Sequence, residues 1–165
     1  MEEKLILLQY SIAKYDSEIV LKEKLNQVLS PKEIERGIDT LIGTRAAEPE
    51  EIENARNAGL RIVNPLDIAE LGVKRVAQLI NARTARSKIY ISVDLDCVDP
   101  ASAPGVSVPS PAGVAANDLI YLLNKVISYG NVVGIDIVEL TPDYDINGMT
   151  AMLAARILSE CIASV

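Results

Sequence analysis

Residues 89–100, which read IYISVDLDCVDP, carry the densest polar cluster of the chain. Their alternating β-branched residues predict a strand that is buried on both faces and ends at Asp94. Asp94 and Asp96 stand two positions apart, so in extended backbone both carboxylates leave the same face. Two hard oxygen ligands suit Mg²⁺ or Mn²⁺. Equally, Asp99 and Pro100 could form a turn in which one of the aspartates only caps the loop.

Outward from this strand, short apolar runs alternate with amphipathic stretches along the whole chain. This pattern predicts a single α/β domain over residues 1–165, with a doubly wound, three-layer sheet of about five parallel strands. A capping box formed by Asp67 and Glu70 is expected to open the helix that runs to about Arg83. The expected strands are residues 4–8, 38–42, 60–63, 89–94 and 132–138, and the expected helices are residues 17–29, 49–59, 67–83, a stretch containing 119–127, and 148–165.

The composition excludes several classes of function. The 165 residues contain 16 basic and 23 acidic side chains, and the net charge of −7 argues against nucleic acid or an anionic membrane as the main partner. No apolar run is long enough to span a bilayer. The two cysteines are too few for a disulfide framework, which favours the reducing cytoplasm. The chain has no histidine, so imidazole-dependent catalysis requires another chain to supply that group.

Two families place Asp-x-Asp after an apolar strand, and the residues that follow distinguish them. No convincing later motifs of the haloacid-dehalogenase type are present. By contrast, Ser92-x-Asp94-x-Asp96-x-x-Asp99-Pro100, with the proline- and glycine-rich residues 103–113 behind it, closely resembles the signature of the ureohydrolases, which include arginases and agmatinases. A second match spans residues 133–145 (VGIDIVELTPDYD), and a weaker one is Ile42-Gly43-x-Arg45.

This resemblance implies both a site and a strand order. Asp94 and Asp96 would bind a binuclear manganese centre, whose bridging hydroxide would attack a guanidinium carbon and release urea. Glu139 would bind the substrate's guanidinium through paired hydrogen bonds. The expected fold is a truncated arginase-like sheet whose five strands, numbered along the chain, lie in the order 5-4-1-2-3.

The chain also departs from the family pattern. Relatives carry histidine ligands in an upstream segment and in an Asp-x-His-x-Asp motif, and the chain is expected to begin after the first of these. Aligned with the second, Gln9, Ser11 and Ala13 occupy the ligand positions. Residues 106–108 (VSV) replace the usual Thr-Gly-Thr, and Ala112 replaces a glycine. We therefore expect no cofactor in the isolated chain, and Mn²⁺ if any metal binds.

The favoured interpretation is a catalytically degenerate ureohydrolase that serves as a non-catalytic or interaction subunit. An alternative is one half of a split manganese-dependent ureohydrolase, of agmatinase or arginase type, that a partner chain completes. A weaker third interpretation is a sensor that binds a guanidino compound or a cation through Glu139. In the expected order, strand 132–138 is an apolar sheet edge. We expect a second copy of the chain or a full-length ureohydrolase relative to cover it.

Overall fold

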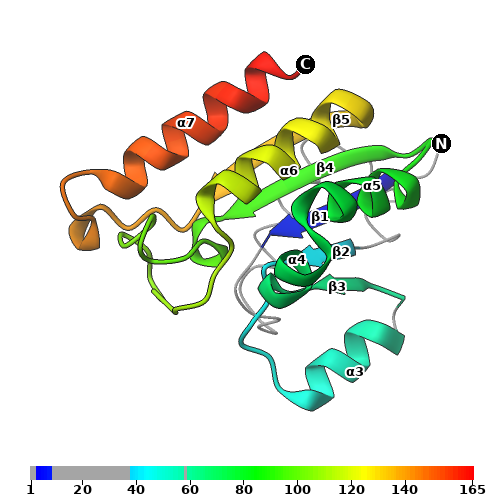
Figure 1. Ribbon diagram of the computed structural model, residues 1–165, viewed down its shortest axis with the longest axis horizontal. Coiled ribbons are helices and arrows are strands. Elements are labelled where there is room, and N and C mark those ends of the chain that lie inside the picture. Colours follow the sequence, from blue (N-terminus) through cyan, green and yellow to red (C-terminus); the bar gives the residue numbers. More distant parts are fainter. Residues whose placement is uncertain (1–2, 9–37, 58) are drawn as a thin grey trace.

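A computed structural model describes residues 3–8, 38–57 and 59–165 (Figure 1). The strands are β1 (Glu3–Leu8), β2 (Ile38–Ile42), β3 (Arg61–Val63), β4 (Lys88–Asp94) and β5 (Asn131–Val138). The helices are α3 (Pro49–Asn57), α4 (Pro65–Leu71), α5 (Val73–Arg83), α6 (Ala116–Tyr129) and α7 (Met149–Ala163), and the two 3₁₀ turns are η1 (Leu95–Cys97) and η2 (Pro142–Tyr144).

The described strands form one parallel sheet in the order β3-β2-β1-β4-β5. Read from its other edge, this is the order expected from the sequence. β4 lies between β1 and β5 and pairs with a neighbour along its whole length, and its side chains at positions 89–93 are buried on both faces. The carboxyl ends of β2, β4 and β5 therefore lie at the same end of the sheet, and the polar loops leave from there.

The main hydrophobic core lies between the sheet and helices α5 and α6, which run across one face of it (Figure 1). Ile89, Ile91 and Val93 of β4 meet the apolar faces of the two helices there. α7 packs against α6 and adds Ile157 and Cys161 to the same core. The helix expected at residues 17–29 lies outside the described residues.

The prediction of one long helix over residues 67–83 is wrong, because this stretch forms two helices, α4 and α5. Gly72, with a φ of 78°, ends α4 and begins α5. A φ in this region is strained for any residue with a Cβ, so glycine permits the break. The capping box also lies three residues earlier than expected. Asn64 Oδ1 accepts from the Asp67 N–H at 2.8 Å, and the Asn64 N–H donates to Asp67 Oδ2 at 2.9 Å.

None of the helices in the part of the chain that the structure describes has the length and apolar character needed to cross a membrane.

Candidate functional site

The loop that follows β4 holds the two aspartates of the Asp-x-Asp motif. Asp94 Oδ1 accepts a hydrogen bond of 2.7 Å from the Asp96 N–H and so caps η1. Asp96 Oδ1 accepts one of 3.1 Å from the Val108 N–H. Burial raises the pKa of Asp94 to about 7, and the charges of Asp96 and Glu139 add to the rise against the opposing Asp96 N–H and Arg45. Burial also raises the pKa of Asp96. Burial and the neighbouring carboxylates therefore disfavour the charged forms of this pair.

Asp99 stabilises the turn that the sequence offered as an alternative to metal binding. Its Oδ1 accepts from the Ala101 N–H at 3.0 Å, and its Oδ2 accepts from the Gly113 N–H at 3.1 Å. The loop closes through a short bridge between Val98 and Val114. Gly113 permits this closure, since a Cβ there would lie only 2.5 Å from the Val98 carbonyl carbon. Asp94 and Asp99 thus shape the turn, and metal binding by Asp94 and Asp96 stays a prediction.

Glu139 comes directly after β5, beside the same loop. Val138 pairs with Asp94 in the sheet, and the Glu139 charge acts on both Asp94 and Asp96. Its backbone has a φ of 66°, which is rare for a residue with a side chain. Strained residues of this kind cluster at functional sites. The structure therefore brings together the three acidic residues singled out from the sequence.

Arg45, which the sequence marked only as part of a weak motif, holds this loop in place. Its Nη2 donates to the Asp96 carbonyl oxygen at 2.9 Å and to that of Ser110, and its Nη1 donates to that of Cys97 at 3.3 Å. Its Nε donates to the Pro111 carbonyl oxygen at 3.2 Å. One side chain after β2 therefore joins both ends of the 96–111 loop. No pattern in the sequence indicated these backbone acceptors.

A second polar group lies on the other face of β4 from the main core. Asp136 of β5 accepts hydrogen bonds from the Tyr90 hydroxyl at 3.0 Å and from Ser92 Oγ at 2.5 Å. Burial, together with the Asp136 charge, raises the pKa of Tyr90 to about 12. Gly134 makes room for the Tyr90 ring, since a Cβ there would lie 2.7 Å from it. These two hydrogen bonds join the side chains of β4 and β5 three residues before Glu139.

Asp145 ties the segment after β5 to α7. It accepts hydrogen bonds from the Thr150 and Ala151 N–H groups at 2.9 and 3.0 Å. Although partial burial opposes them, these bonds hold the pKa of Asp145 below its usual range. Gly105 packs directly on Asp145, and its N–H donates to Thr150 Oγ1 at 2.7 Å. The two motif segments, residues 92–113 and 133–145, therefore pack against each other at Gly105 and Asp145.

The carboxylate oxygens that remain available in the loop after β4 decide whether a metal can bind there. Asp94 and Asp96 each use one carboxylate oxygen within the loop, which leaves one oxygen apiece. Across residues 3–8, 38–57 and 59–165, no three His, Cys, Asp or Glu side chains are grouped so that they could hold a metal ion. The described residues therefore do not fit a binuclear centre. Gln9, Ser11 and Ala13, at the expected ligand positions, lie outside the described residues.

The chain is similar to proteins of one known family. Residues 25–164 match the family described as the arginase family. Proclavaminate amidinohydrolase of Streptomyces clavuligerus is 37% identical over 115 residues, which are 70% of this chain and 36% of that protein. Formimidoylglutamase of Streptococcus gordonii is 32% identical over 105 residues, or 63% of this chain and 32% of that protein.

Solved structures agree with the sequence relatives. That of the proclavaminate amidinohydrolase has a TM-score of 0.83 and 29% identity, covering 99% of this chain and 56% of that one. The agmatine ureohydrolase of Thermoplasma volcanium has a TM-score of 0.75 and 30% identity, covering 99% and 55%. These relatives share the partial arginase-like α/β fold seen here. The chain belongs to the arginase family, whose members depend on manganese, and it spans about half the length of these solved relatives.

Proposed function

We propose that this chain is a catalytically degenerate arginase-family protein that acts as a non-catalytic or interaction subunit. The observation that supports this most directly is the donor set after β4. Of the positions that the family resemblance assigns to manganese, the described residues supply Asp94 and Asp96, each with one oxygen already bonded within the loop. Two divalent ions carry four positive charges, and two carboxylates balance half of that. Such a pair is a weak basis for a binuclear centre.

The proposed interaction surface is the edge strand β5 together with the outer face of α7. β5 is the last strand of the sheet within the described residues, and its Val133 is 39% exposed. α7 lies at the same end of the molecule (Figure 1), where its Met152 is 63% exposed and its Ile162 is 68% exposed. An apolar strand edge beside apolar side chains favours association with another polypeptide.

The partner we propose is an arginase-family polypeptide, either a second copy of this chain or a full-length relative. With a net charge of −7, neither nucleic acid nor an anionic membrane surface is a good electrostatic match. Cys97 and Cys161 are both buried and unpaired, which is compatible with the reducing cytoplasm as its location.

One observation favours the alternative, a split ureohydrolase. Glu139 lies beside Asp94 and Asp96 in a strained backbone conformation, and the three carboxylates together would attract a cation or a guanidinium. In that case a partner would complete the manganese site, and this chain would contribute the two aspartates and the carboxylate for substrate.

Urea release from arginine and agmatine, with Mn²⁺ present, tests the two functions. The chain alone is expected to release none. The complex with the co-purified partner is then compared with one that carries D94N and D96N, using D118N at the start of α6 as the control. Unchanged activity of the complex supports a non-catalytic subunit, while loss of activity in D94N/D96N alone supports the split enzyme. Urea release by the chain alone contradicts both.

A further inference from the structure

Helix α7 carries an apolar stripe on the side that faces away from the core. The helix lies along the outside of α6 (Figure 1), and its Ile157 and Cys161 enter the core. Leu158 and Ile162 do not enter it, and they remain 46% and 68% exposed. We call the following four exposed residues the α7 stripe: Ala151, Ala155, Leu158 and Ile162.

The spacing of the α7 stripe is that of a helix which packs on another helix. Successive members stand four, three and four positions apart, so they form one line along the helix. The two small members lie in the first half of α7, and the two large members lie in the second half. The stripe is therefore asymmetric in size along its length.

This asymmetry makes the stripe complementary to itself in one direction only. A parallel pair of stripes would set large side chains against each other and leave gaps between the alanines. In an antiparallel pair, Ala151 meets Ile162 of the second copy. Ala155 likewise meets Leu158 of the second copy. Every layer then contains one small and one large side chain, which allows close packing along the whole contact.

The charges of α7 also permit contact with a second copy. The chain has a net charge of −7, so two copies repel each other unless they meet at a neutral surface. The charged side chains of α7 are Arg156 and Glu160, and they form an ion pair of 2.6 Å within the helix. Neither belongs to the α7 stripe. Two stripes can therefore meet without burying an unpaired charge.

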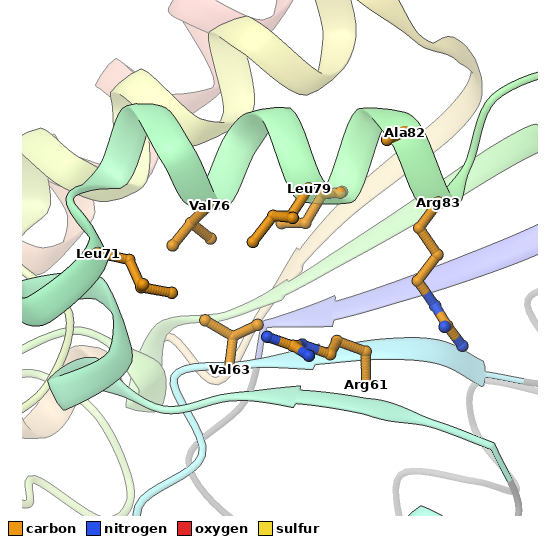
Figure 2. A pocket seen from close by; sticks show the side chains of 8 residues that line it. Arg61, Val63, Leu71, Val76, Leu79, Ala82 and Arg83 are labelled. Carbon is orange, nitrogen blue, oxygen red and sulfur yellow. The ribbon is translucent and has the colours of Figure 1, made fainter.

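The apolar side chains at the opposite edge of the sheet lack this property. Leu71 and Leu79 line a groove between α5 and β3, and Arg61 extends into the same gap (Figure 2). That groove mixes apolar and charged side chains, whereas the α7 stripe is apolar throughout.

From these observations we propose that α7 pairs with α7 of a second copy of this chain, antiparallel and through the α7 stripe. The inference rests on the function proposed above, an interaction subunit, and selects one of its two candidate partners. Such a contact is isologous, with its two-fold axis passing between positions 156 and 157. Because one helix pair forms a small interface, the dimer is expected to be reversible and to depend on concentration.

Disulfide trapping tests the direction of this pairing. A151C and I162C are prepared separately, and the native Cys97 and Cys161 are buried. Mild oxidation of the mixture is expected to join the two variants, whereas each variant alone should not cross-link, because its two introduced cysteines lie at opposite ends of the contact. In the control mixture A163C replaces I162C. Position 163 is exposed but lies on a different side of α7, so that mixture should not cross-link.

Sedimentation over a range of concentrations measures the strength of the pairing. L158A removes a large side chain from two layers of the dimer and should weaken dimerisation about tenfold or more. L66A, at an exposed leucine of α4, is the matched control and should change nothing. Circular dichroism establishes that each variant is folded.

The inference is overturned if the mixture of A151C and I162C does not cross-link, if either variant links to itself, or if A163C links equally well. These results are distinguishable from failure of the proposed function. A chain that does not pair with itself but co-purifies with a full-length relative would still be an interaction subunit. Urea release by the chain alone would contradict the proposed function whatever the cross-linking shows.

Discussion

Ala112 has a φ of 61°, a left-handed conformation that side chains with a Cβ avoid, and it stands where the family resemblance has a glycine. A112G is therefore expected to stabilise the fold by about 0.5–1 kcal/mol, the relief of strain exceeding the entropy that glycine loses. The neighbouring G113A should destabilise it by about 1–3 kcal/mol, because the new Cβ would collide with the backbone at Val98 and Asp99.

Urea unfolding of the two variants beside the wild type measures both effects. Because the residues are adjacent and both changes exchange alanine and glycine, each variant is the control for the other. Effects of the same sign for A112G and G113A would contradict this description of the loop.

Asp94 makes stability depend on pH. Its folded pKa of about 7 lies above its ordinary value near 3.8, so the fold favours the protonated form. The stability contributed by this preference is complete below about pH 4 and is lost as pH rises through 7. In chelator, the wild type should lose on the order of 2–4 kcal/mol between pH 4 and pH 8. D94N, which can still accept the Asp96 N–H, should lose much less.

Urea midpoints at the two pH values, with D118N in the first turn of α6 as the control, provide the measurement. A wild-type midpoint that is equal at pH 4 and pH 8, or a decline that persists in D94N, would show that Asp94 is not buried in this way.

At the scale of the elements, Arg45 connects the end of β2 to the loop after β4 through carbonyl groups of Asp96, Cys97, Ser110 and Pro111. Lysine keeps the charge but cannot reach several acceptors in one plane. R45K should therefore cost about 1.5–3 kcal/mol in urea unfolding and hasten proteolytic cleavage within residues 106–112. R56K in the last turn of α3 is the control and should change little. Equal stability of R45K and wild type would contradict the role assigned to Arg45.

The elements also show what the sequence could predict and what it could not. Alternation of apolar runs with amphipathic stretches located the strands, and the Asp-x-Asp stretch with its continuation indicated the family and so the strand order. Local signals failed at Gly72, where helical periodicity continues through a break that only a φ value reveals. The contacts of Arg45 were out of reach for another reason. Backbone carbonyls accept its bonds, and every residue has one.

At the scale of the whole molecule, the surface formed by β5 and α7 should mediate association. Light scattering coupled to size exclusion is expected to find the purified chain as an oligomer, or in complex with an arginase-family relative when it is isolated from its native cell. M152E and I162E, each placing a charge on an exposed apolar position of α7, should disrupt that association. L66E, at an exposed leucine of α4, is the matched control. A wild-type chain that stays monomeric and co-purifies with no relative would contradict this proposal.

We propose that this chain, on its own, does not build the family's binuclear manganese centre. Calorimetric titration of the purified chain with Mn²⁺ at mildly alkaline pH tests it without requiring a choice of substrate. We expect no tight binding of two ions, and any weak binding should disappear in D94N/D96N, because those carboxylates are the retained ligands. Two tightly bound Mn²⁺ ions per chain would contradict the claim and would make the chain a candidate enzyme in its own right.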